Sequence, residues 1–118
     1  RSISNWVSKC MTTDIGYYFN MDQIKADPWN SPEKMWQHSP LKYANMAKTP
    51  TLFIQSDEDY RCWMGDAIQM FSALKYFGVE ARMCLFHGEN HELSRSGKPK
   101  HRIRRMTEMM EWFEKYLK

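Results

Sequence analysis

The pattern of apolar and polar residues in the middle of the chain predicts a strand, a helix and a second strand. Residues 51–54 form a short apolar run that favours extended backbone, and Pro50 suits the start of a strand because it has no N–H group. Residues 66–77 show apolar side chains at helical spacing, and Gly78 follows where a glycine commonly ends a helix. Residues 79–86 alternate between apolar and polar, which is typical of a strand.

The C-terminal part predicts a loop at residues 87–99 and one long amphipathic helix from about residue 100 to residue 117. The apolar residues of this helix recur at helical spacing, so we expect them to be buried on one face. They are Ile103, Met106, Met110, Phe113 and Leu117. Before the central strand, Ser31 and Pro32 favour the start of a short helix through residues 33–37, and residues 11–19 indicate an irregular or short helical segment.

A strand, a helix and a strand joined by short links imply parallel pairing with a right-handed crossover, which is an α/β fold. Two strands make a poor sheet, because the outer edges of both would have no partner. We therefore expect the sheet to continue in strands that precede Arg1 in a longer chain. That the first residue is arginine and not methionine fits this expectation.

Composition narrows the classes of function without selecting one. A chain of 118 residues suits one small domain, and its net charge of +3 gives no case for a nucleic-acid or membrane partner. No apolar run approaches the roughly 20 residues that cross a bilayer. Cys10, Cys62 and Cys84 are odd in number and include no CxxC pair, which favours reduced thiols in the cytoplasm over disulfides or structural zinc.

Acidic residues follow the first predicted strand, and histidines follow the second. The carboxyl ends of neighbouring parallel strands meet at one edge of a sheet, so Asp59 is expected to reach His91. An acid that binds one imidazole nitrogen fixes the tautomer, and the other nitrogen can then act as a general base toward a hydroxyl. His87 is the weaker alternative. A solvated acidic turn and a plain surface histidine remain open as interpretations of these residues.

Two other clusters suggest a binding site but are more simply explained as ordinary loop and surface residues. His87 and His91 with Glu89 between them suggest a metal site, but the spacing does not place both rings on one helix face, and Gly88 disfavours a helix there. We therefore expect no metal. The basic run at residues 101–105 could bind phosphate, but helical spacing indicates a solvated face, with some residues paired to acids.

Several motifs together resemble one known family. Residues 39–43, 48–52, 59–61 and 88–95 are similar in order and spacing to the C-terminal half of the catalytic domain of prolyl oligopeptidase-type serine peptidases, close to the acylaminoacyl-peptidase branch. The segments 2–6 and 13–16 also match the stretch that follows the nucleophile in that family.

The resemblance implies an α/β-hydrolase domain, usually beside a β-propeller, with peptides or acylated peptides as substrates and no cofactor. It implies that Asp59 is the acid and His91 the base of a Ser-His-Asp triad. Arg61 matches a position that binds a substrate carbonyl in some members. The aromatic segment around Trp6 and residues 17–19 lies where the family builds part of an apolar specificity pocket.

The sequence departs from the family pattern at three places. Gln55 and Ser56 stand where the family usually has His-Gly, and Trp63 stands where it has proline. The Gly-x-Ser-x-Gly nucleophile motif is absent. We therefore expect residues 1–118 to be the C-terminal part of a peptidase catalytic domain that carries the acid and the base, and to be inactive alone.

Other interpretations remain. The chain could be a truncated or degenerate hydrolase domain that serves binding or assembly without catalysis, and an RNA-binding role for Arg102, Arg104 and Arg105 is a more distant one. Unpaired strand edges favour self-association or association with the missing N-terminal part.

Overall fold

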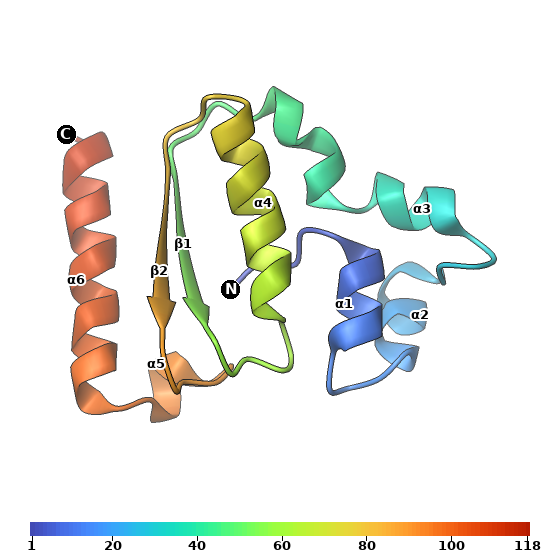
Figure 1. Cartoon of the computed structure of the whole chain (residues 1–118), viewed down its shortest axis with the longest axis horizontal. Helices are drawn as coiled ribbons and strands as arrows, with labels where there is room; N and C mark the ends of the chain where they lie inside the picture. The colour runs from blue at the N-terminus through green and yellow to red at the C-terminus, as the bar shows by residue number, and fades with distance from the viewer.

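A computed structural model describes all 118 residues and shows two parallel strands flanked by helices (Figure 1). In chain order the elements are α1 (Trp6–Thr12), α2 (Tyr18–Ile24), α3 (Pro32–Gln37), the 3-10 helix η1 (Pro40–Met46), β1 (Thr51–Ser56), α4 (Met64–Tyr76), β2 (Ala81–Phe86), α5 (Leu93–Ser96) and α6 (Pro99–Tyr116). The predicted α/β class is confirmed. None of the helices combines the length and the hydrophobicity that crossing a lipid bilayer requires.

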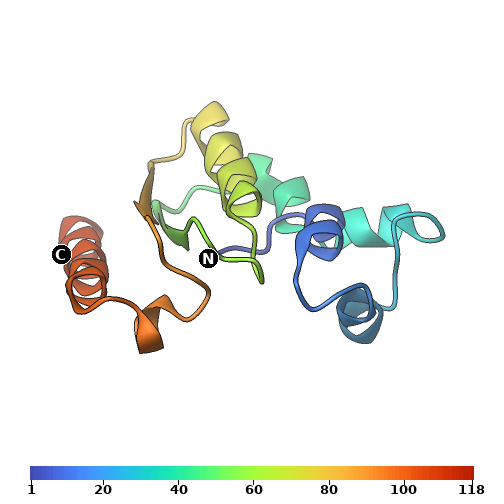
Figure 2. The same ribbon diagram turned by 60° about the horizontal axis from the view of Figure 1, so that its bottom comes forward.

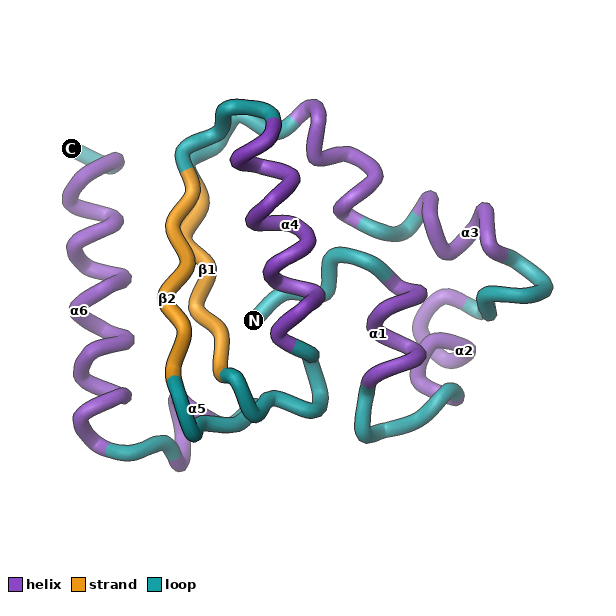
Figure 3. The backbone as a smooth tube through the Cα atoms, in the orientation of Figure 1, coloured by secondary structure: helices purple, strands orange, loops and turns teal.

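The two strands pair in parallel along their whole length, from Thr51 opposite Ala81 to Ser56 opposite Phe86. Both therefore end at the same edge, and the loops that follow them lie side by side at the lower edge in Figure 3. The two-stranded sheet has no other strand. The chain start lies along the free edge of β1, where the amino group of Arg1 donates a hydrogen bond to the carbonyl of Ile54.

Helix α4 packs its apolar stripe against one face of the sheet. Phe53 of β1 and Ala81 of β2 form a buried cluster with Ala67 and Leu74 of α4. Gly78 adopts a positive φ of 75°, and its N–H donates to the carbonyl of Lys75 at 3.1 Å, so the predicted glycine stop of this helix is confirmed. The sequence pattern of this helix therefore matches the core that it builds.

Helix α6 lies on the other side of the strands from α4 (Figures 1 and 2). The prediction that its apolar stripe is buried is wrong for this chain, because every residue of the stripe is exposed. The exposed fractions are 68% for Ile103, 50% for Met106, 54% for Met110, 52% for Phe113 and 75% for Leu117. The side chains of α6 that approach the strands are Glu108, Met109 and Trp112, which lie about a third of a turn around the helix from this stripe.

A polar contact fastens α6 to the sheet instead. Glu108 is buried, and its carboxylate accepts hydrogen bonds from Arg82 of β2 at 2.9 and 3.0 Å. Arg104, one turn earlier in the helix, donates to the same carboxylate at 3.0 Å. The expectation that part of the basic run pairs with acids is thus confirmed.

Helices α1, α2 and α3 form a second small cluster on the far side of α4 from α6 (Figure 2). Its buried apolar residues are Cys10, Ala26 and Met35. Asp66 connects the chain start to α4, because its carboxylate accepts from the backbone N–H groups of Ser4 at 2.8 Å and Asn5 at 3.2 Å. Burial raises the pKa of Asp66 above its ordinary value, and these hydrogen bonds oppose that effect.

Candidate active site

Asp59 and His91 lie in the two neighbouring loops that follow β1 and β2. The Nδ1 atom of His91 is 3.0 Å from Oδ2 and 3.1 Å from Oδ1 of Asp59. The Asp59 side chain is 2% exposed and the His91 side chain 21% exposed, so the contact is shielded from solvent mainly on the acid side. The parallel register brings these two residues together as the sequence predicted.

The local backbone holds the Asp59 carboxylate in place. Its Oδ1 atom accepts hydrogen bonds from the N–H groups of Arg61 at 3.0 Å and Cys62 at 2.7 Å. A short polar side chain that binds backbone two or three residues ahead closes a tight turn. The orientation of the Asp59 carboxylate is therefore fixed by its own loop, independently of His91.

The orientation of His91 leaves one ring nitrogen available. Because an ionised carboxylate only accepts, the Nδ1 that faces Asp59 carries the proton in the neutral ring. Nε2 then has the free lone pair, and it has no hydrogen-bond partner within the chain. A lone pair held in this way can remove a proton from a hydroxyl group.

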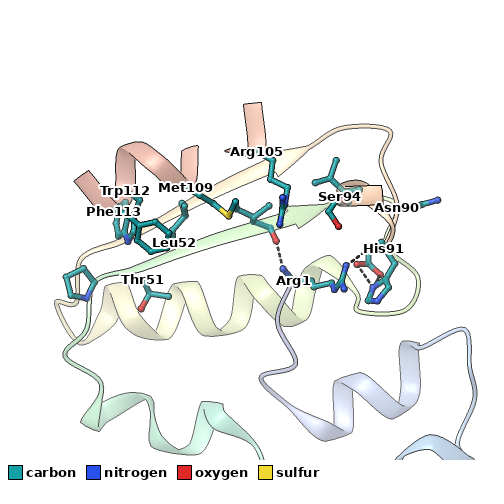
Figure 4. A pocket seen from close by; sticks show the side chains of 15 residues that line it. Arg1, Thr51, Leu52, Asn90, His91, Ser94, Arg105, Met109, Trp112 and Phe113 are labelled. Atoms are coloured by element: carbon teal, nitrogen blue, oxygen red, sulfur yellow. Dashed lines mark hydrogen bonds and ion pairs between the residues drawn. The ribbon is translucent and has the colours of Figure 1, made fainter. Parts of the chain in front are cut away.

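Two cavities open beside His91. One, of about 480 Å³, runs between the free edge of β1 and α6, and Figure 4 shows Arg1 reaching toward His91 at one end and Trp112 and Phe113 at the other. The second, of about 500 Å³, lies on the side of α1 and α2 and is lined by Ile3, Ile15, Phe19, Lys9, Arg61 and Cys62. Both are also lined by Arg1 and His91.

Arg61 lies on the wall of the second cavity and is held by Asp14, in the turn between α1 and α2. Its Nε atom is 2.6 Å from Oδ1 of Asp14, and its Nη2 atom is 3.4 Å from Oδ2. The arginine holds the pKa of Asp14 below its usual value. The Arg61 side chain remains 39% exposed, so a further acceptor can still approach its guanidinium group.

Sequence reasoning missed Lys9, a buried cation behind this loop. Its ammonium group donates to the carbonyl of Arg61 and to Oγ1 of Thr13 at 3.3 Å, and it lies 5.2 Å from the ring centre of Phe19. A lysine on a short helix gives no sign in the sequence that it will be buried, because its partners come from distant segments. Burial raises the pKa of the neighbouring Cys62 thiol, whose Sγ is 3.7 Å from the ammonium group.

The departures from the family pattern are accommodated around the acid. The buried Gln55 side chain donates to the carbonyl of Cys62 at 2.9 Å and so closes the loop that holds Asp59. Trp63 precedes α4 and lies over Gly65, where an added Cβ would be 2.4 Å from the indole ring. With these residues in place, the acid keeps its hydrogen bonds to the N–H groups of Arg61 and Cys62.

The weaker histidine candidate binds a different acid. Nδ1 of His87 is 2.5 Å from Oδ2 of Asp57, and the His87 side chain is 96% exposed. Hydrogen bonds from His87 and from the N–H of Gly88 hold the pKa of Asp57 below its ordinary value. His87 and His91 thus contact separate carboxylates, and no three metal-binding side chains of the chain gather in one place.

Comparison with known proteins gives this geometry a context. Residues 1–118 match the family model described as the prolyl oligopeptidase family. The chain is 43% identical over 117 residues to the uncharacterized peptidase YuxL of Bacillus subtilis, with 99% of this chain and 18% of that protein covered. It is 35% identical over 82 residues to an acylamino-acid-releasing enzyme of Arabidopsis thaliana, covering 70% of this chain and 10% of that protein.

Solved structures show the same relationship. The uncomplexed acylaminoacyl peptidase of Pyrococcus horikoshii superposes with a TM-score of 0.90 and 37% identity, over 95% of this chain and 18% of that one. The 118 residues thus span less than a fifth of the length of these relatives. With the whole chain matched by one family model, the chain belongs to the prolyl oligopeptidase family of serine peptidases.

Proposed function

We propose that these residues form the C-terminal part of a serine peptidase catalytic domain, with Asp59 as the triad acid and His91 as the general base. The 3.0 Å contact between Asp59 and Nδ1 of His91 carries this proposal, because it leaves Nε2 without a hydrogen-bond partner in the chain. Family membership supplies the reaction class, hydrolysis of peptide bonds through a serine nucleophile. The serine belongs to the longer polypeptide, since no Gly-x-Ser-x-Gly motif occurs in the 118 residues.

The mechanism follows from the geometry of the pair. A serine hydroxyl placed at Nε2 of His91 would lose its proton to that nitrogen as it attacks the substrate carbonyl. The imidazolium that forms would be stabilised by the Asp59 carboxylate, which accepts a hydrogen bond from Nδ1–H while the proton stays on the ring. His91 would then donate its Nε2 proton to the leaving amine.

We assign Arg61 to substrate binding, where its guanidinium group would donate to a carbonyl of the peptide. Its place on the cavity beside His91 supports the assignment. The apolar walls of the same cavity, Ile3, Ile15 and Phe19, favour a hydrophobic side chain next to the cleaved bond. The name of the Arabidopsis relative suggests N-acylated peptides as one substrate class to test.

The test uses the full-length polypeptide that contains these residues and a set of acylated and free peptide anilides. Asp59→Asn should lower kcat by about 10⁴-fold, because the amide stabilises the wrong tautomer of His91. The matched control is Asp57→Asn, which changes the contact with the exposed ring of His87 and should leave kcat within about two-fold. Equal losses in both variants would remove Asp59 from the triad.

The 118 residues alone should not react with a fluorophosphonate probe, whereas the full-length polypeptide should. A histidine and an aspartate without their nucleophile retain only general-base catalysis. A full-length polypeptide that ignores the probe and all the anilides would instead favour a hydrolase-like module that binds without catalysis.

A further inference from the structure

The loop between β2 and α6 must be held firmly if His91 is to keep its geometry, and only part of that support comes from the Asp59 side. The N–H of Asp57 donates to the carbonyl of Phe86 at 3.1 Å, and the N–H of Glu58 donates to the carbonyl of Glu89 at 3.0 Å. These bonds tie the loop to the acid-bearing loop. Nothing among them ties it to α6, on its other side.

Glu89, two residues before His91, supplies the missing connection. It is 5% exposed, and its Oε1 atom lies 2.7 Å from Nδ1 of His101 in the first turns of α6. The same oxygen accepts from the N–H of Lys98 at 3.0 Å. These contacts hold the pKa of Glu89 below its ordinary value. One residue thus joins the acid-bearing loop, through its carbonyl, to α6, through its carboxylate.

The surroundings of this carboxylate leave little room for adjustment. A Cβ added to Gly97 would lie 2.8 Å from Oε2 of Glu89 and 2.4 Å from the carbonyl of Leu93, so only glycine fits there. The His101 ring packs at an angle of 64° against Phe86, with 5.6 Å between ring centres, and its side chain is 21% exposed. We call Glu89, Gly97 and His101 the loop clamp.

We propose that Glu89 and His101 are positioning residues for His91, which hold the histidine loop at hydrogen-bonding distance from Asp59 through the contact between the Glu89 carboxylate and the His101 Nδ1–H. This inference rests on the proposed function. Neither residue is among those that line the two cavities beside His91, so their effect on catalysis passes through the loop. A misplacement of about 1 Å at a reacting group can lower the rate by about 10²-fold.

Two substitutions of His101 in the full-length polypeptide separate hydrogen bonding from packing. His101→Asn keeps an N–H donor on the atom attached to Cγ but loses the ring, whereas His101→Phe keeps a ring against Phe86 but has no donor. We expect His101→Phe to lower kcat by about 10- to 100-fold with KM changed less than about two-fold. His101→Asn should recover most of the loss. Glu89→Gln, which keeps an acceptor for Lys98, should fall between the two.

The control changes the other imidazole–carboxylate contact of the same loop. His87→Ala removes an exposed ring that contacts Asp57, and kcat should stay within about two-fold of the unchanged protein. The opposite order for the His101 variants, with phenylalanine active and asparagine impaired, would overturn the proposal, because the ring would then act by packing alone. Unchanged kcat in Glu89→Gln and both His101 variants would overturn it as well.

A second readout does not depend on turnover. In full-length protein with ¹⁵N-labelled histidine, the Nδ1–H proton of His91 should give a far-downfield signal, assigned by its loss in His91→Ala. We expect this signal to weaken in His101→Phe and to persist in His101→Asn and His87→Ala. If the unsubstituted protein shows the signal but cleaves no peptide, the proposed peptidase function fails while the loop clamp is still tested. A signal unchanged in His101→Phe would refute the clamp whatever the activity.

Discussion

The two faces of the small sheet are held to their helices by different forces. Helix α4 docks through a buried apolar cluster that includes Phe53, Ala67 and Leu74. Helix α6 docks through the buried carboxylate of Glu108 and leaves its apolar stripe exposed. Apolar burial carries no titrating group and is not weakened by charge screening, whereas an ion pair with half-exposed partners weakens in acid and in salt. The apolar side chains of α4 that face the sheet are thus buried within these 118 residues, whereas the apolar stripe of α6 is not.

The two faces should differ most in how much stability is lost when an apolar side chain of the helix is truncated to alanine. Leu74→Ala should lower the free energy of unfolding by about 2 to 5 kcal/mol, because it leaves a cavity at a residue that is 2% exposed. Met110→Ala is the matched change on the stripe of α6, where the side chain is 54% exposed, and should cost less than about 0.5 kcal/mol. Urea unfolding followed by circular dichroism measures both. Similar losses at the two positions would mean that the α6 stripe is covered in solution.

The next largest effect is expected from a substitution that removes the polar contact between α6 and the sheet. Glu108→Ala leaves Arg82 and Arg104 without their acid, but both arginine side chains are more than half exposed and can be hydrated. We expect a loss of about 1 to 2 kcal/mol in the free energy of unfolding, smaller in high salt. Glu114→Ala, an exposed acid on the same helix, serves as the control and should be nearly neutral. A loss that does not depend on salt would argue for packing in place of charge.

A smaller effect of the same contact should appear in the dependence of stability on pH. Arg82 and Arg104 lower the pKa of Glu108 from 4.5 to about 2. A folded-state pKa below the unfolded one stabilises the fold above pH 4.5, and this stabilisation is lost as the pH falls toward 2.

The amount is about 1 kcal/mol once solvent screening of the arginines is allowed for. Glu108→Gln should remove this part of the acid slope, and the difference between the two unfolding curves isolates it from other carboxylates. Parallel curves would show that Glu108 titrates normally.

Substitutions on the exposed stripe of α6 should have the smallest effect on stability and the clearest effect on self-association. Met106→Lys and Met110→Lys should leave the free energy of unfolding within about 0.5 kcal/mol while lowering self-association of the 118-residue chain, measured by sedimentation. Tyr76→Lys is the control: Tyr76 is 84% exposed on α4, away from the stripe, and should not change association. If the unsubstituted chain is a monomer at all concentrations, the stripe does not drive association.

The sequence alone determined the order of β1, α4, β2 and α6 and the edge at which the site forms, but it did not predict α1, η1 or α5. Helical spacing, alternation and Gly78 gave α4 and β2 to within a few residues, because these signals act between neighbours in the chain. Parallel pairing then placed Asp59 near His91, since both follow strands that end at the same edge. The motifs that resemble one family pointed to the same two residues.

Only the tertiary structure decided which side chains those elements bury. Amphipathic spacing predicted a buried stripe on α6, but burial needs a partner surface, and two strands do not supply one. Lys9, Asp66 and Glu89 are polar residues whose partners lie 52, 62 and 12 residues away in the sequence, so no local pattern marks them as buried. Burial of a charged group is fixed by the groups that satisfy its hydrogen bonds, and those come together only when the chain has folded.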